Sequence, residues 1–149
     1  MVICCFDITI VPLIKMIINN NDANCFILGE WRFGTASGYN SIVGLSIGTG
    51  LGAGLILDGK LYNGRNCGAG EVGMLPYLQA NYEYYLGGAT FEEVYGIPSV
   101  QAFELAQLGD SSSLAIWDTF GQHMGQAVMS VMYAYDPEMI VMGGSISKA

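Results

Sequence analysis

Two glycine-containing breaks divide residues 41–62 into three short apolar runs, and this pattern constrains the fold more than any other part of the chain. The runs cover residues 41–47, 54–57 and 60–62, and the breaks between them are Gly48-Thr49-Gly50 and Asp58-Gly59. Asp-Gly between apolar runs is a strong signal for a two-residue hairpin turn. The pattern therefore predicts an antiparallel meander.

Residues 111–135 predict a long helix with apolar side chains along one face. Ser111 or Ser112 can cap its start, and Asp136-Pro137 stops it. Three small residues on the helix are expected to allow close packing: Gly121, Gly125 and Ala127.

Shorter segments complete the secondary structure. Strands are expected over residues 2–20 and 139–142, and helical segments over 21–32, parts of 81–96 and 99–108. Strands interleaved with helices predict an α/β fold with a mixed sheet flanked by helices.

Composition narrows the classes of partner. Hydrophobic residues make up 52% of the 149 residues and charged residues only 12%, against about 25% charged in an average domain. A surface with so few charged residues is expected to be covered in part by a partner subunit or another lobe.

The net charge of −8 and the five scattered basic residues argue against nucleic-acid binding. No apolar run is long enough to span a membrane, and the four cysteines form no CxxC pair, which favours reduced cytoplasmic thiols.

Asp22 is the first candidate for chemistry. It follows an apolar run and opens a helix, where a carboxylate is held on a rigid platform and can act as a general base. Either Asn21 or Asp22 can instead simply cap the helix, which is the commoner role of such residues.

The segment 48–54, GTGLGAG, is the second candidate. Glycines let a backbone approach a phosphate closely, and Thr49 adds a hydroxyl donor. No Gly-Lys-Ser/Thr follows, so it is not a Walker loop, and a strand follows where a dinucleotide fingerprint needs a helix. A plain glycine hairpin remains the alternative.

Glu71, inside the glycine-rich loop GAGEVG, is the third candidate. Its carboxylate either accepts hydrogen bonds from sugar hydroxyls or is a solvated acid of the loop.

Taken together, these motifs resemble the ROK (repressor, open reading frame, kinase) family, which includes bacterial glucokinases and related sugar kinases. The matching motifs occur in one order over residues 17–147: NDAN followed by LGE, GTGLGAGLILDGKLYNG, GAGEVG, and DPE with IVMGGSIS. Each motif is weak alone, and the ordered set is specific.

The resemblance implies an actin-like, ribonuclease H-like ATPase fold with two lobes around a cleft. It implies Asp22 as the catalytic base that accepts a proton from a sugar hydroxyl. The implied sugar ligands are Asn21, Glu71 and Glu83, the last because NYEYYLGG is similar to a family segment with a Glu five residues before a Gly. The residues implied to face ATP are Gly48, Thr49, Gly50 and Gly52 at the phosphates, and Gly143 and Gly144 at the adenosine. Mg²⁺ would accompany ATP, and a cytoplasmic homodimer is expected.

The zinc motif of the family is not matched. Met74 stands where the family has a zinc-binding His, and the following LPYLQANY has no cysteine. We therefore expect no zinc, with packing of tyrosines in its place: Tyr77, Tyr82, Tyr84 and Tyr85. His123 is expected to be a packed or surface histidine.

The ends of the family pattern are not matched either. Nothing before Asn21 resembles a DxGGT-type loop, and the helix that the family pattern has after the adenosine-side glycines is expected to be missing. Residues 1–149 are thus expected to be a single lobe, the central and C-terminal part that binds sugar and nucleotide, without the N-terminal lobe and with little kinase activity alone.

Three functions fit these observations. The first is ATP-dependent phosphorylation of a hexose or amino-sugar hydroxyl by a carbohydrate kinase. The second is sugar sensing by a non-catalytic regulator of the same family, although the helix-turn-helix of such regulators does not occur here. The third is a structural fragment that persists as an oligomer.

Overall fold

The computed structural model describes residues 21–146, so the strands expected within residues 2–20 lie outside the described residues. The elements in chain order are α1 (Asp22–Phe33), β1 (Ile42–Ile47), β2 (Leu51–Leu57), β3 (Lys60–Leu61), the 3-10 helix η1 (Val72–Met74), β4 (Pro76–Tyr77), β5 (Ala80–Asn81), α2 (Tyr82–Leu86), α3 (Phe91–Tyr95), α4 (Ser99–Gln107), α5 (Ser111–Tyr135) and β6 (Met139–Gly143).

The main sheet is mixed, as predicted, with the strand order β3-β2-β1-β6. The predicted meander is confirmed, because β1, β2 and β3 pair antiparallel, while β6 pairs parallel to β1. Asp58 and Gly59 form the second turn with φ values of 51° and 66°, the left-handed region that this hairpin turn requires. β2 begins at Leu51, three residues earlier than expected, because Leu51 already pairs with Ile47.

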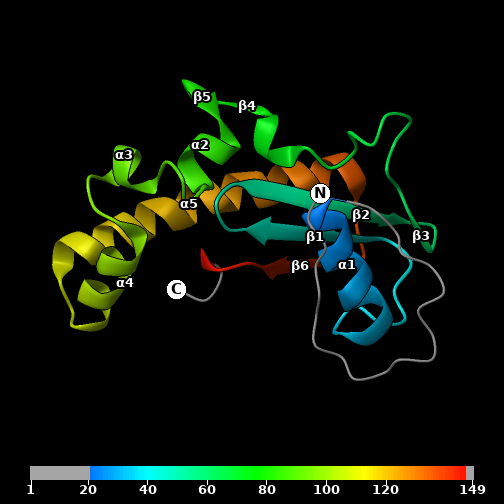
Figure 1. The fold of residues 1–149 in the computed structure, drawn as a ribbon, viewed down its shortest axis with the longest axis horizontal. Helices are drawn as coiled ribbons and strands as arrows, with labels where there is room; N and C mark the ends of the chain where they lie inside the picture. Colours follow the sequence, from blue (N-terminus) through cyan, green and yellow to red (C-terminus); the bar gives the residue numbers. More distant parts are fainter. Residues whose placement is uncertain (1–20, 147–149) are drawn as a thin grey trace.

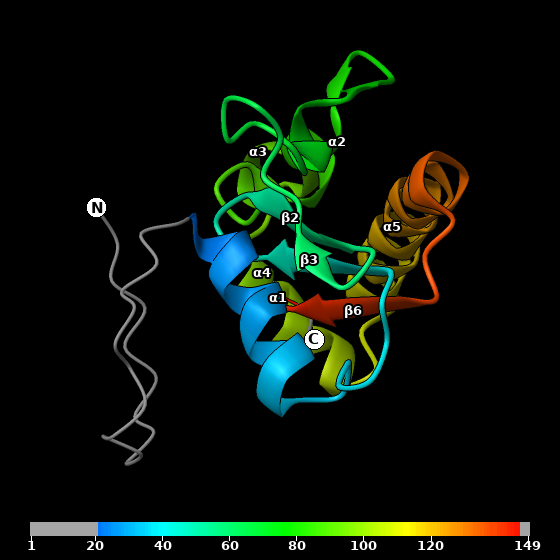
Figure 2. The ribbon, with the colours of Figure 1, turned by 90° about the vertical axis from the view of Figure 1, so that its right-hand side faces the viewer.

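Helices cover both faces of this sheet (Figures 1 and 2). The α1 face buries Ile42 and Ile56 of the strands against Ile27 of the helix. The α5 face buries the alternate strand residues against Val131: these are Val43, Leu45, Ala53 and Leu55. The period-two alternation of each strand therefore places an apolar side chain on both faces.

The long helix α5 has the predicted extent, but its cap is Asp110 and not Ser111 or Ser112. Asp110 has extended backbone, and its carboxylate accepts the Ser113 N–H at 2.8 Å. This hydrogen bond lowers the pKa of the Asp110 carboxyl, because it stabilises the charged form.

The expected close packing on α5 holds for Ala127 alone among the three small residues. Ala127 is fully buried. Gly121 and Gly125 are exposed, and no atom of another element lies within 4 Å of where their Cβ would be. That part of the prediction is wrong, since both glycines lie on the open side of the helix.

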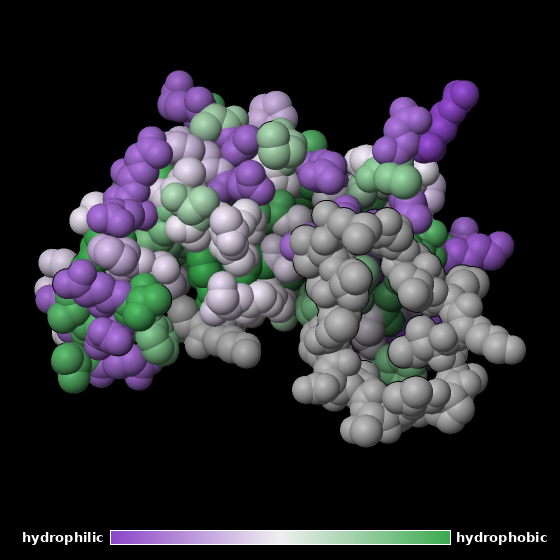
Figure 3. All heavy atoms as spheres, viewed as in Figure 1, coloured by the Kyte–Doolittle hydropathy of each residue, from purple (hydrophilic) through white to green (hydrophobic). Residues whose placement is uncertain are grey.

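The predicted helical segments after residue 81 are confirmed as α2, α3 and α4, which pack with α5 around an aromatic core. Figure 3 shows hydrophobic side chains interspersed with hydrophilic ones at the end of the molecule formed by α4 and the start of α5. The exposed apolar residues there are Val100, Leu108 and Leu114. Within residues 21–146, no helix combines the length and apolar character that crossing a membrane requires.

Candidate functional site

Asn21 is the N-cap of α1, so Asp22 is not needed for that role. The Asn21 side chain accepts the Asn24 N–H at 2.8 Å. Asp22 is exposed in the first turn, where one carboxylate oxygen accepts the Ala23 N–H at 2.9 Å. The neighbouring asparagine thus leaves the Asp22 carboxylate available at the helix start, where the free N–H groups favour negative charge.

The glycine segment forms the turn between β1 and β2. The Gly48 N–H donates to the Gly50 carbonyl at 3.0 Å, which closes the turn and exposes Thr49. The Gly48 and Thr49 carbonyls accept the N–H groups of Gly88 and Ala89 at 2.8 and 2.9 Å. The turn is therefore held from outside by the loop that follows α2, and is more than a plain hairpin.

Glu71 lies in the loop between β3 and η1, and its side chain is exposed. Two hydrogen bonds position this loop. The Gly70 carbonyl accepts the Ala53 N–H at 3.0 Å, and the buried Asn24 donates through its amide to the Asn63 side chain at 3.1 Å. The sequence gives no signal for the contact between Asn24 and Asn63, because it joins residues 39 positions apart.

Glu83 comes from the first turn of α2 and reaches the glycine turn. Its Oε2 accepts the Leu51 N–H at 3.1 Å. A Cβ on Gly50 would collide with this carboxylate, so only glycine lets the side chain lie across the turn.

One polar cavity of about 320 Å³ brings these groups together. Its lining includes the predicted base Asp22 and the predicted sugar ligands Asn21, Glu71 and Glu83. It also includes four residues that were predicted to face phosphates: Gly48, Thr49, Gly50 and Gly52. The prediction missed the remaining four, Ala23, Ser46, Leu51 and Ala53. Ser46 follows from the register, since it pairs with Gly52 across the two strands.

A second, shallower hollow of about 240 Å³ shares Gly48 and Thr49 with the polar cavity. Its other lining residues come from the loop after α2, the start of α4 and the end of the chain: Gly88, Ala89, Ser99, Ser145 and Ile146.

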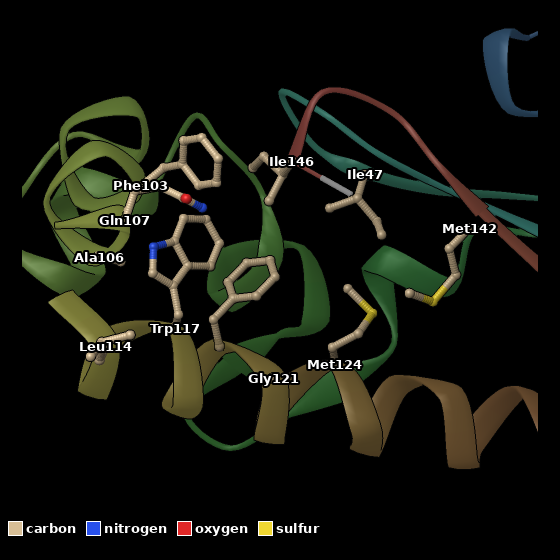
Figure 4. A pocket seen from close by; sticks show the side chains of 11 residues that line it. Ile47, Phe103, Ala106, Gln107, Leu114, Trp117, Gly121, Met124, Met142 and Ile146 are labelled. Carbon is tan, nitrogen blue, oxygen red and sulfur yellow. The ribbon is translucent and has the colours of Figure 1, made fainter. Parts of the chain in front are cut away.

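Ile146 also lines a third cavity, which is apolar and measures about 390 Å³ (Figure 4). The side chains of Met124 and Trp117 rise into it from α5, Met124 toward Ile47 and Trp117 toward Phe103 and Gln107. The buried Trp117 Nε1 has no hydrogen-bond partner there.

Gly143 and Gly144 lie beside these hollows without lining them. A Cβ on Gly143 would lie 2.5 Å from the Phe26 ring, so this glycine lets α1 pack on β6. Gly144 has a φ of 101° and passes against the Ile47 backbone. Their chain neighbours Met142 and Ser145 line the hollows instead.

An aromatic cluster occupies the segment without the zinc motif. Tyr77 stacks on Tyr82 with ring centroids 4.4 Å apart, and its hydroxyl lies 3.0 Å from His123 Nδ1. Burial lowers the pKa of His123 and raises that of Tyr77. His123 is thus a packed histidine, one of the two roles expected for it, although its tyrosine partner was not foreseen. Across residues 21–146, no three His, Cys, Asp or Glu side chains form a group that could hold a metal ion.

Comparison with known proteins identifies the family and several relatives of this chain. A family profile described as ROK family matches residues 13–149. The chain is 30% identical over 166 aligned positions to a glucokinase of Thermotoga maritima, covering 91% of this chain and 52% of the relative. It is 34% identical to the N-acetylgalactosamine kinase AgaK of a Shewanella species, covering 86% and 49%. The chain thus spans about half the length of these curated relatives.

Solved structures of ROK proteins also superpose on this chain. The ROK hexokinase of Thermus thermophilus superposes with a TM-score of 0.80 at 28% identity, covering 87% of this chain and 49% of the other. A ROK family glucokinase of Streptomyces griseus, in complex with glucose and AMPPNP, superposes with a TM-score of 0.78 at 25% identity, covering 87% and 52%. The expected fold class, an actin-like ATPase lobe with a mixed sheet flanked by helices, is confirmed.

Proposed function

Because the chain belongs to the ROK family, we propose that it binds a sugar and ATP and serves the phosphorylation of a sugar hydroxyl. The observation that carries the proposal is a set of three hollows that share lining residues, the first polar and the last apolar. Gly48 and Thr49 join the first two hollows, and Ile146 joins the second to the third. A sugar, a chain of phosphates and a nucleoside have this same order of polarity.

The polar cavity is the proposed sugar site. Its walls present the Asn21 amide and the Glu71 and Glu83 carboxylates, which suit hydrogen bonds to neighbouring sugar hydroxyls. The Asp22 carboxylate is the proposed general base, since it lies in the same cavity as the phosphate-facing turn. Phosphoryl transfer mainly requires that the attacking hydroxyl be positioned and its proton accepted.

The turn at Gly48, Thr49, Gly50 and Gly52 is the proposed phosphate site. Thr49 is exposed at the boundary between the polar and the shallow hollow, where its hydroxyl can donate to a phosphate oxygen. Glycine on both sides of it permits close approach of the backbone.

The shallow hollow and the apolar cavity are proposed to receive the ribose and the base. Gly143 and Gly144 act there by letting the chain pass close to Phe26 and Ile47, which brings Ser145 and Ile146 to the hollow. Mg²⁺ is proposed to enter with ATP and to be bound mainly through its phosphates, the usual mode for this ion. Its positive charge would offset the charge of the transferring phosphoryl group. No zinc is included in the proposal.

We also propose that the protein is a cytoplasmic homodimer. The exposed apolar residues Val100, Leu108 and Leu114 and the 12% of charged residues favour self-association. The exposed Cys67 is a free thiol, which suits a reducing compartment. Sedimentation velocity at micromolar concentration tests this proposal, and a single monomer boundary contradicts the dimer.

Titration calorimetry tests the sugar and nucleotide sites separately. Glucose and N-acetylglucosamine are titrated into the chain with and without MgATP. Glu71→Gln should remove or weaken the sugar heat, Thr49→Ala should weaken the MgATP heat, and Asp22→Asn should keep both while abolishing formation of ADP. Sugar binding that survives Glu71→Gln and Glu83→Gln together would show that the polar cavity is not the sugar site.

A further inference from the structure

We infer that Tyr77, Tyr82 and His123 are positioning residues that hold the Glu83 carboxylate in the polar cavity by anchoring α2 to α5. This inference deepens the proposed function and rests on it, since it names what fixes one of the four polar side chains of the proposed sugar site. None of the three lines that cavity.

The first anchor is on the hairpin that leads into α2. Strands β4 and β5 pair over only two residues each, and α2 begins directly after β5. The Tyr77 hydroxyl lies 3.0 Å from His123 Nδ1 on α5, and the Tyr77 ring meets the His123 ring edge to face at 5.6 Å. The hairpin is thereby attached to the middle of the long helix.

The second anchor is the residue next to Glu83. Tyr82 is buried, and its ring stacks on Tyr77. Its hydroxyl lies 2.8 Å from Ser130 Oγ and donates to the Gln126 carbonyl at 3.2 Å. Both partners belong to α5, Gln126 about one turn and Ser130 about two turns beyond His123.

Glu83 is held from its other end by the glycine turn. Its Oε2 accepts the Leu51 N–H and lies where a Cβ on Gly50 would collide. The Glu83 side chain thus connects α2, which is attached to α5, with the turn between β1 and β2. A helix of five residues has little stability of its own. Its position therefore depends on the side chains that attach it.

Further attachments of α2 lie along it, since the Tyr82 N–H donates to the Leu75 carbonyl at 3.3 Å and the Tyr85 ring packs on His123, and others lie at its C-terminal end. Thr90 Oγ1 donates to the Tyr84 carbonyl at 2.6 Å, and the Tyr95 hydroxyl donates to the Tyr85 carbonyl at 2.9 Å. Glu83 lies in the first turn of α2, which is the end of the helix that Tyr77 and Tyr82 attach to α5.

His123 favours its neutral form because it is partly buried, and the Nδ1 of a neutral imidazole can accept a hydrogen bond from the Tyr77 hydroxyl.

Conservative variants of the 149-residue chain test the anchor. Tyr77→Phe removes only the hydroxyl, and His123→Phe removes its partner. Tyr84→Phe is the matched control, since its hydroxyl bonds to the exposed Glu93 and not to α5. The probes are N-acetylglucosamine and glucose in calorimetry, and the exchange rate of the Leu51 amide by nuclear magnetic resonance.

Tyr77→Phe and His123→Phe should each raise the sugar Kd by about three- to tenfold, the effect of one lost hydrogen bond. The double variant should be no weaker than the single ones, because both remove the same bond. The Leu51 amide should exchange faster relative to the amides of β1, while Tyr84→Phe changes neither quantity.

An unchanged Leu51 exchange rate in Tyr77→Phe overturns the inference, whether or not His123→Phe folds. If the wild-type chain binds neither sugar, the proposed function fails, yet Leu51 exchange still decides whether the anchor positions Glu83. If sugar binds and the two single effects add in the double variant, the two residues do not act through one bond and the inference is wrong.

Discussion

Gly44 and Gly54 lie directly opposite each other in the β1–β2 pair, and the side chain of Ile27 fills the space above them. A Cβ on Gly54 would lie 2.5 Å from Ile27 Cγ2 and 2.6 Å from the Ala23 carbonyl oxygen, and one on Gly44 would lie 2.8 Å from Ile27 Cδ1. This pair of glycines brings α1 against the sheet. The start of α1, with Asp22, consequently reaches the glycine turn.

Gly54→Ala should therefore disturb both the fold and the site. The new methyl group meets the α1 backbone as well as Ile27, so the helix must move away from the sheet. We expect a loss of about 1–3 kcal/mol in the free energy of unfolding, the usual cost of overpacking, together with weaker sugar binding. Urea denaturation and calorimetry measure the two effects.

Gly29→Ala on the same helix is the control for that experiment. No atom of another element lies within 4 Å of where its Cβ would be. Alanine has the higher helix propensity by about 1 kcal/mol, so this variant should be at least as stable as the wild type. Equal stability of the Gly54 and Gly29 variants would contradict the close contact of α1.

These glycines show what the sequence could and could not predict. The strands, the Asp58-Gly59 turn and the extents of α1 and α5 follow from local patterns, because turn chemistry and apolar periodicity act over a few residues. The hole above Gly44 and Gly54 depends on strand register and on which helix covers it. Neither the register nor the covering helix is encoded within one segment. The sequence therefore shows that these residues are glycines, but it does not predict that Ile27 packs against them.

In the candidate site, too, some residues could be predicted from the sequence and the contacts between them could not. The four polar residues of the cavity could be chosen because they lie in recognisable motifs: Asn21 and Asp22 share NDAN, Glu71 lies in GAGEVG and Glu83 in NYEYYLGG. The links between motifs were missed: Glu83 to the Leu51 N–H, Asn24 to Asn63 and Tyr77 to His123. Each joins residues more than 30 positions apart, where no periodicity relates them.

Gly50→Ala tests the link between Glu83 and the glycine turn. The alanine methyl would occupy the place of the Glu83 carboxylate, which is the free end of a flexible side chain and can move away. We therefore expect a small change in stability and a clear loss of sugar affinity, about tenfold if one charged hydrogen bond is lost. A variant that unfolds, or one that binds sugar normally, would contradict this expectation.

Glu138 should make stability depend on pH. Its Oε2 accepts the N–H groups of Asn40 and Ser41 at 2.6 and 2.9 Å, just before β1. These bonds lower the pKa of Glu138 below its ordinary value of 4.5. A lowered folded pKa means that the stabilisation is fully present above the unfolded pKa and is lost as pH falls through the folded value.

The test compares the wild type with Glu138→Gln in urea denaturation from pH 7 to pH 3. The wild type should be the more stable protein at pH 7, and the difference should shrink as the pH falls below the ordinary glutamate range. A difference that is constant over this range would show that the charge of Glu138 does not contribute to stability.

Asn21 and Asp22 separate the structural role of the helix start from its proposed chemistry. Asn21 supplies the N-cap hydrogen bond to Asn24, so Asn21→Ala should cost about 1 kcal/mol of unfolding free energy, the usual value for a lost cap. Asp22→Asn keeps an oxygen for the Ala23 N–H, so stability should change little, while ADP formation in the presence of sugar should disappear. Thermal denaturation and a coupled ADP assay distinguish the two variants. If Asp22→Asn is the variant that loses stability and ADP formation is unaffected, Asp22 is a capping residue and the proposed base must be sought elsewhere in the cavity.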